Sequence, residues 1–120
     1  MDHLVLVIDD EAVIRELMER HLTAIGCKVV TAANAEEGAR RASEAKPDLV
    51  FMDIRMPGMG GIKGLKNLRR LYHDLKVVML TAIEDMRVAQ NAINQGALQY
   101  IHKPIDLPTI TQLTYKYLPR

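Results

Sequence analysis

The sequence has little of several features that mark special classes of protein. It has one cysteine, Cys27, so no disulfide can form within the chain, which suits a reducing compartment. Its apolar runs are short, and a run such as residues 4–8 is far too short to cross a bilayer. Asp2 follows Met1 and Asp9 closes the first apolar run, which is not the pattern of a signal peptide. We therefore predict a cytoplasmic protein.

Charge of one sign is not in excess either. Lys and Arg number 16 and Asp and Glu number 15, a net charge of +1. This balance provides no overall field to attract nucleic acid or a membrane surface, so we expect this domain to bind neither directly. A chain of 120 residues buries roughly two thirds of its unfolded surface, which is enough for one core, and we predict one domain over residues 1–120.

Short apolar segments alternate with amphipathic ones along the chain. The short segments are typical of buried strands, and the others carry apolar residues at helical spacing. Repeated strand and helix units predict an α/β fold, a parallel sheet with helices on both faces. The predicted strands are residues 4–8, 28–32, 49–52, 76–80 and 98–101, and the predicted helices are residues 13–25, 34–45, 62–71, 85–95 and 107–117.

Polar residues follow four of the predicted strands at the point where each strand ends. In an open parallel sheet the carboxyl ends of the strands lie along one edge, where ligands bind. We therefore expect the side chains after these strands to lie close together. The residues are Asp9 and Asp10 after the first strand, Asp53 after the third, Thr81 after the fourth and Lys103 after the fifth.

Such a cluster has a definite chemistry. Two carboxylates ~4 Å apart repel by about 4 kcal/mol at an effective dielectric constant near 20. A Mg²⁺ ion held by one or two carboxylates and water relieves that repulsion. Lys103 adds a positive charge and Thr81 a hydroxyl, and phosphoryl transfer depends mainly on positioning and charge neutralisation. We predict that Asp53 is the nucleophile and forms an acyl phosphate.

The same residues lie in motifs that resemble the receiver domain of two-component response regulators. The motifs are Asp9-Asp10, residues 52–59, Thr81-Ala82 and Lys103-Pro104, and in this order they cover essentially the whole chain. The resemblance implies a CheY-like, flavodoxin-like (βα)5 fold, a doubly wound parallel sheet of strand order 2-1-3-4-5. It also implies Mg²⁺-dependent phosphorylation of Asp53 by a phosphohistidine on a sensor histidine kinase or a phosphotransfer protein.

The resemblance assigns a role to each residue of the cluster. It implies that Asp10 and Asp53 bind Mg²⁺ directly, that Asp9 binds it through water, and that the backbone carbonyl of Arg55 completes the protein ligands. It implies that Thr81 and Lys103 contact the phosphoryl oxygens. A receiver is not an enzyme in the usual sense, because it assists only its own phosphorylation and its own slow dephosphorylation.

Other implied features concern the surroundings of the phosphoryl group. Lys103-Pro104 is expected to be a cis peptide, which proline makes less costly. Tyr100 matches the aromatic residue that turns inward when Thr81 moves toward the phosphoryl group. That pair would shift a two-state equilibrium on the face of the fourth helix, fifth strand and fifth helix, and so control an effector.

The sequence departs from the common receiver pattern at Gly60, Gln99 and Ile105, and none of these three touches the phosphorylation chemistry. Four further positions lie beside the phosphoryl group or near the output face. Arg55 and Ile83 stand two residues after the predicted acceptor and the predicted switch threonine, where they would flank the phosphoryl group and tune water access. Arg87 and Asp106 are charges near the output face, but they do not form the set of opposite charges that dimerising receivers carry. Dimerisation on phosphorylation is therefore left open.

Structural explanations and other functions compete with this interpretation. Asp9, Asp10 or Thr81 could cap a helix, Lys103 could be solvated, and Tyr100 could be a packing residue. A phosphatase similar to the haloacid dehalogenase-like hydrolases would need an acid where Arg55 stands and more chain for a cap. A degenerate receiver would bind partners without phosphorylation, which the intact set of acids argues against.

Overall fold

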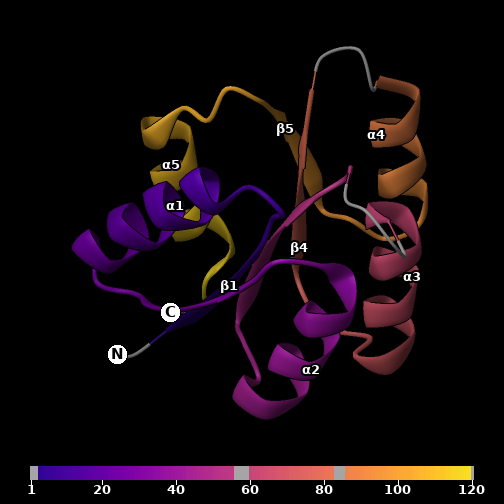
Figure 1. Ribbon diagram of the computed structural model, residues 1–120, viewed down its shortest axis with the longest axis horizontal. Coiled ribbons are helices and arrows are strands. Elements are labelled where there is room, and N and C mark those ends of the chain that lie inside the picture. Colours follow the sequence, from indigo (N-terminus) through magenta and orange to yellow (C-terminus); the bar gives the residue numbers. More distant parts are fainter. Residues whose placement is uncertain (1–2, 56–59, 83–85, 120) are drawn as a thin grey trace.

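Five strands and five helices alternate along the part of the chain that the computed structural model describes, residues 3–55, 60–82 and 86–119 (Figure 1). The predicted alternation is confirmed. Among these residues no helix is both long and apolar enough to span a membrane. The strands are β1 Leu4–Ile8, β2 Lys28–Ala32, β3 Leu49–Asp53, β4 Val77–Thr81 and β5 Gln99–His102, and the helices are α1 Ala12–Ala24, α2 Ala35–Ala45, α3 Gly61–Leu71, α4 Met86–Asn94 and α5 Leu107–Tyr117.

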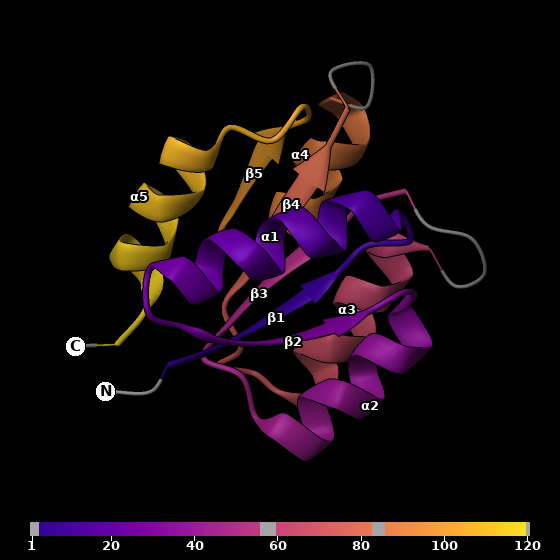
Figure 2. The ribbon, with the colours of Figure 1, turned by 60° about the vertical axis from the view of Figure 1, so that its left-hand side comes forward.

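The strands form one parallel sheet in the order β2-β1-β3-β4-β5 (Figure 2). The predicted order 2-1-3-4-5 is confirmed. The direction of winding reverses between β1 and β3, which are neighbours in the sheet. Ile8 of β1 pairs with Met52 of β3, so the residues that follow them, Asp9 and Asp53, leave the sheet side by side. Ligands in this class of fold bind at such a reversal point.

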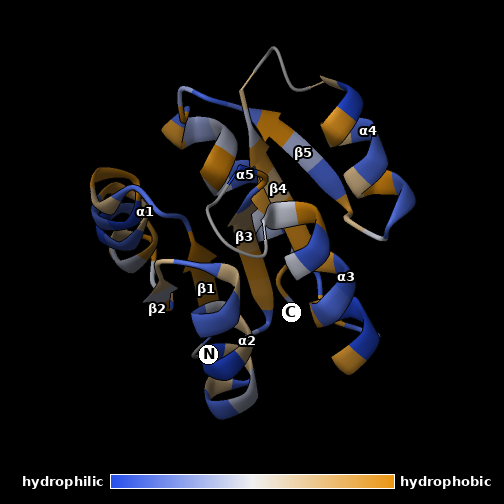
Figure 3. Ribbon diagram, turned by 45° about the vertical axis from the view of Figure 1, so that its right-hand side comes forward, coloured by the Kyte–Doolittle hydropathy of each residue, from blue (hydrophilic) through white to orange (hydrophobic). Residues whose placement is uncertain are grey.

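Helices cover both faces of the sheet, with α1 and α5 on one face and α2, α3 and α4 on the other (Figure 2). Alternate residues of each strand face opposite sides, so one strand supplies both cores. Phe51 packs with Met18 of α1 and Ile110 of α5, whereas Met52 packs with Leu65 of α3. The three central strands, β1, β3 and β4, are accordingly apolar along most of their length, whereas the edge strands β2 and β5 also carry polar residues, and the helices carry their polar residues outward (Figure 3).

Strands β3, β4 and β5 each end one residue later than predicted. Strand β4 includes Thr81, which pairs with His102 of β5, and Asp53 is the last residue of β3 rather than the first residue of a loop. Backbone hydrogen bonds continue the ladder there, because Ile54 N donates to Leu80 O (3.0 Å) and Lys103 N donates to Thr81 O (2.7 Å). The sheet itself therefore holds the residues expected at its edge.

The connection from β3 to α3 is closed by a backbone hydrogen bond. Gly61 N donates to Ile54 O over 2.9 Å, which places the start of α3 against the end of β3. A side chain at Gly61 would collide with the carbonyl oxygen of Ile54, so only glycine permits this approach. The start of α3 is thus held against Ile54, the residue that directly follows Asp53.

Candidate functional site

Lys103 stands at the centre of an acidic cluster at the carboxyl edge of the sheet. Its Nζ lies 3.1 Å from Asp9 Oδ2, 3.3 Å from Asp53 Oδ2 and 3.3 Å from Glu11 Oε1. Asp9 is fully buried and Asp53 is 4% exposed, so these charges interact largely away from solvent. One ammonium group therefore faces three carboxylates from two separate segments of the chain.

Glu11 is a member of the cluster to which the sequence assigned no role. It directly follows the predicted pair Asp9-Asp10, and that adjacency was the available signal. One carboxylate oxygen from each of Asp9, Asp10, Glu11 and Asp53 lies within 4.8 Å of the others. Asp10 and Glu11 are exposed while Asp9 and Asp53 are buried, so the cluster opens to solvent on one side.

The donor set fits a hard divalent cation. The Oδ2 of Asp9 is buried and, apart from its ion pair with Lys103, accepts no hydrogen bond within the described residues. A buried carboxylate oxygen that accepts so few hydrogen bonds lowers the stability of the fold unless a second positive group lies against it. The available donors are carboxylate oxygens, which Mg²⁺ prefers. Asp10 and Asp53, together with a backbone carbonyl such as that of Arg55, are the predicted ligands.

The electrostatics show an excess of negative charge in the cluster. Burial, and then the charge of Asp9, raise the pKa of Asp53 to about 6, against the opposing effects of Lys103 and of the Arg55 N–H, which lies 3.2 Å from Asp53 Oδ1. Burial also raises the pKa of Asp9. Burial alone would lower the pKa of Lys103, but Asp53 and Asp9 raise it above its ordinary value. Lys103 is therefore a permanent cation that does not neutralise its neighbours completely.

An open pocket leads to the Asp53 carboxylate. Its lining consists of Asp10, Glu11, Asp53, Arg55, Ala82 and Lys103. Asp53 is thus buried within the fold and yet reachable from solvent by a small group. That combination suits a carboxylate that reacts with an incoming substrate.

Thr81 and Tyr100, the predicted switch pair, occupy neighbouring strands. Thr81 is buried, and its hydroxyl donates to the carbonyl oxygen of Ala82 (3.0 Å) rather than to a group of the cluster. Tyr100 is half-buried against the core under α2, α3 and α4, and its ring meets the ring of His102 edge-on at 5.8 Å. In this arrangement the Thr81 hydroxyl is turned toward the backbone of the next residue.

The remaining predicted residues have simpler positions. The peptide between Lys103 and Pro104 is cis. Arg55 is exposed at the pocket mouth, whereas Ile83 and the motif residues 56–59 lie outside the described residues. Arg87 is exposed on α4, and Asp106 caps α5 by accepting from the backbone N–H of Thr109 (3.2 Å).

The fold and the site define a doubly wound α/β domain with a candidate metal site at its point of strand reversal. Comparison with known proteins places it more closely. The family model described as "Response regulator receiver domain" matches residues 5–115. Sporulation initiation phosphotransferase F of Bacillus subtilis (strain 168) is 32% identical over 119 residues, which cover 99% of this chain and 96% of that protein. The chain therefore belongs to the response regulator receiver family of two-component signal transduction, as the motifs predicted.

Other relatives agree, although some are much longer. The DNA-binding transcriptional regulator NtrC of Escherichia coli (strain K12) is 38% identical over 104 residues, which cover 87% of this chain but only 22% of that protein. Among solved structures, chemotaxis protein CheY4 of Vibrio cholerae superposes with a TM-score of 0.91 at 28% identity and covers 98% of this chain and 100% of that chain. The receiver domain of NtrX from Brucella abortus superposes with a TM-score of 0.91 at 30% identity, and the match covers 95% of this chain and 97% of that chain. The CheY-like fold is confirmed.

Proposed function

We propose that the chain is a phosphorylation-driven switch in which Asp53 accepts a phosphoryl group from a phosphohistidine of a sensor histidine kinase or a phosphotransfer protein. The observation that carries the proposal is the position of Lys103, 3.3 Å from the carboxylate of Asp53 inside an acidic cluster that fits Mg²⁺. Receiver domains generally bind Mg²⁺, and family membership supports the same chemistry.

In the proposed reaction a carboxylate oxygen of Asp53 attacks the phosphorus of the donor. A P–O bond forms, the N–P bond breaks, and its electron pair stays on the histidine nitrogen. A pKa of about 6 leaves most of Asp53 ionised at neutral pH, so the nucleophile is available. Lys103 neutralises charge on the transferred group, and the Arg55 N–H holds the other carboxylate oxygen.

Mg²⁺, held by Asp10, Asp53, the carbonyl of Arg55 and Asp9 through water, would supply further positive charge for the phosphoryl oxygens. Thr81 is the residue that has to move. Its hydroxyl would leave the carbonyl of Ala82 for a phosphoryl oxygen, and Tyr100 would turn inward behind it. The resulting change on the face of α4, β5 and α5 is the proposed signal to an effector.

The chain acts on its own Asp53 and not on a series of external substrates, so it is not a phosphatase or kinase. Its location is cytoplasmic, which agrees with the free, buried thiol of Cys27. The effector is either a separate protein or a further domain of a longer chain, since the residues matched in NtrC are 22% of that protein.

Intact-mass measurement after incubation with acetyl phosphate and Mg²⁺ tests the proposal. We expect wild type to gain one phosphoryl group and Asp53→Asn to gain none, while Asp74→Asn, an exposed acid outside the cluster, behaves as wild type. Omission of Mg²⁺ should abolish the gain. No adduct in wild type with acetyl phosphate or a phosphohistidine donor would overturn the proposal in favour of a phosphorylation-independent docking domain.

A further inference from the structure

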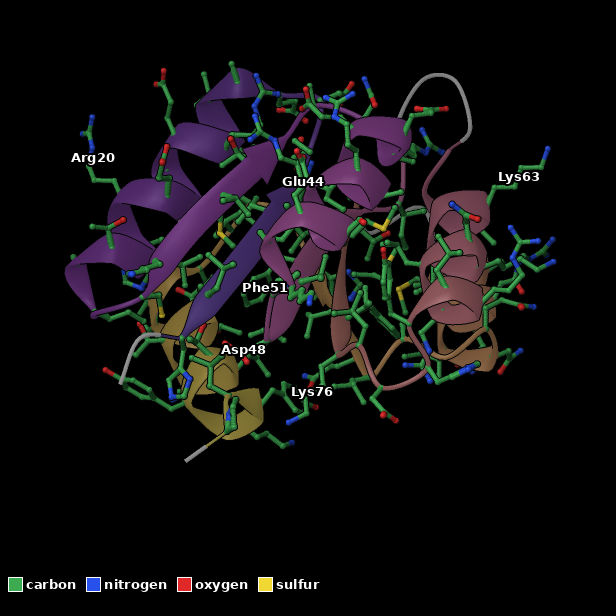
Figure 4. All side chains as sticks on the ribbon, turned by 90° about the horizontal axis from the view of Figure 1, so that it is seen from below. Arg20, Glu44, Asp48, Phe51, Lys63 and Lys76 are labelled. Carbon is green, nitrogen blue, oxygen red and sulfur yellow. The ribbon has the colours of Figure 1, made fainter. Side chains whose placement is uncertain are left out.

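The outward side of α3 is strongly basic. It carries Lys63, Lys66, Arg69 and Arg70, and residues 60–73 contain no Asp or Glu. Figure 4 shows Lys63 pointing from α3 into solvent, away from the rest of the molecule. Within residues 3–55, 60–82 and 86–119, no ion pair joins one of these four cations to a carboxylate. This concentration contrasts with the balanced charge of the whole chain.

These cations border an open hollow of about 750 Å³ between α3 and the residue after α4. Its lining contains neither an acidic nor an aromatic side chain. Six residues form it: Lys63, Lys66, Asn67, Arg69, Arg70 and Gln95. We call this surface the α3 basic face. Polar and cationic groups thus converge on a concave surface instead of being scattered around the helix.

Two of the guanidinium groups are held in place. Arg69 donates from Nη1 to Leu75 O (2.7 Å), and a side chain at Gly96 would lie only 2.8 Å from Arg69 Nε, so glycine leaves room for the guanidinium. Arg70 donates from Nη2 to Asn67 Oδ1 (2.9 Å). A guanidinium has five N–H donors, so both groups keep donors for a ligand. Groups that are already ordered lose less entropy when a ligand binds.

We propose that the α3 basic face is a docking surface for an acidic segment of a partner protein. Lys63, Lys66 and Arg70 follow one another at helical spacing along about 10 Å of the helix. A short segment with carboxylates at the same spacing matches that row. The surface makes no use of the acidic cluster around Asp53, so the inference goes beyond the proposed function and does not depend on it.

A protein partner fits these features better than other polyanions do. The hollow presents no aromatic side chain on which the bases of a single strand could stack. Four cations in a chain of net charge +1 neutralise only a few phosphates of a duplex. The lining also lacks the apolar side chains that an interfacial helix inserts into a membrane.

Fluorescence anisotropy of the unphosphorylated protein tests the proposal. The probe is a fluorescein-labelled peptide of about 14 residues of Glu and Ala, with Glu at every third or fourth position to match the row of cations. The test variant is Lys63→Glu/Lys66→Glu/Arg70→Glu. The matched control is Arg20→Glu/Arg41→Glu/Lys116→Glu, which changes the net charge equally at exposed positions on α1, α2 and α5. If the test variant fails to fold by circular dichroism, Lys63→Gln/Lys66→Gln replaces it.

We expect saturable binding that weakens with added salt and at least about tenfold weaker binding by the test variant, against about twofold or less by the control. Equal weakening by both variants would assign the binding to net charge and overturn the proposal. So would an absence of saturable binding to wild type. Single-stranded and duplex oligonucleotides and phosphatidylserine vesicles are tested in the same way. If one of them binds more tightly than the peptide, and only the test variant loses that binding, the proposed protein partner is wrong and that ligand replaces it. Because Asp53 is not involved, failure here leaves the phosphorylation test untouched.

Discussion

The ammonium of Lys103 lies 3.3 Å from a carboxylate oxygen of Asp53, although 50 positions separate the two residues in the chain. Each stands at the end of a strand, on opposite sides of β4 in the sheet. The sheet edge brings them together, and burial strengthens the interaction between them. Much of the chemistry proposed for the domain depends on this pair.

Replacement of Lys103 by Met should destabilise the metal-free protein. The side chain of Lys103 is 18% exposed, and its loss leaves the carboxylates of Asp9 and Asp53 without their cation. We expect the free energy of unfolding in EDTA at neutral pH to fall by about 3 kcal/mol, measured by urea denaturation. Mg²⁺ should restore more stability to this variant than it adds to wild type. The control is Lys66→Met, at an exposed position where the described residues provide no ion pair. Equal stability of Lys103→Met and wild type in EDTA would contradict the prediction.

Stability of the metal-free protein should fall as pH rises. Asp53 titrates with a pKa of about 6 in the folded protein against an ordinary value of 3.8, so the folded state binds its proton more tightly. The favourable contribution is fully present below the unfolded pKa and is lost as pH rises through the folded pKa. The asparagine introduced by Asp53→Asn does not titrate, so that variant should not lose this contribution. Between about pH 4 and pH 7 we expect the unfolding free energy of wild type to fall relative to that of Asp53→Asn by on the order of 3 kcal/mol.

Urea denaturation in EDTA across that pH range provides the measurement. Asp74→Asn controls for the loss of one exposed carboxyl group. A difference between Asp53→Asn and wild type that does not change with pH would show that Asp53 keeps an ordinary pKa. Addition of Mg²⁺ should remove most of the pH-dependent difference, since a bound cation favours the ionised carboxylates.

Mg²⁺ should stabilise the folded protein through the acidic cluster. A ligand that binds only the folded state adds about 1.4 kcal/mol at ten times its dissociation constant. We expect the thermal midpoint of wild type to rise with MgCl₂ and the rise to be much smaller in Asp10→Asn. Glu11→Gln should reduce the rise less, because the Glu11 carboxylate is paired with Lys103. NaCl at equal ionic strength is the control. Equal midpoints in MgCl₂ and NaCl would rule out this metal site.

Thr81 should separate phosphorylation from switching. Its hydroxyl now donates to Ala82 O, and the proposal requires it to turn to the phosphoryl group. Thr81→Ala should still gain a phosphoryl group by mass but should lose the shift of the Tyr100 amide signal in ¹H–¹⁵N spectra, whereas Thr81→Ser should keep both. A full Tyr100 shift in phosphorylated Thr81→Ala would show that the switch runs through other residues.

The sequence predicted most of the fold because each element has a local cause. Strands β1 and β3 are short apolar runs, and Asn34 caps α2 by accepting a hydrogen bond from the Glu37 N–H. The ends of β4 and β5 were one residue short, since the pairing of Thr81 with His102 is a contact between distant segments that no local pattern reveals.

Most members of the candidate site could be predicted from the sequence, but their contacts could not. The edge rule brings Asp9, Asp53 and Lys103 together, yet the partner of Lys103 depends on side-chain rotamers. Glu11 was not predicted as a member of the site, because an exposed glutamate just before a helix is common for structural reasons alone. That Thr81 bonds to the carbonyl of Ala82 likewise follows from one rotamer and not from its position in the chain.

The hydrogen bond between Gly61 N and Ile54 O holds together the two ends of the connection from β3 to α3. Once the ends of a loop are held, doubling its length costs only about 0.6 kcal/mol of closure entropy. Insertions after Arg55 should therefore leave the sheet and the start of α3 in place. The connection from β3 to α3 is thus a place where chain length can change while Asp53 stays fixed at the end of its strand.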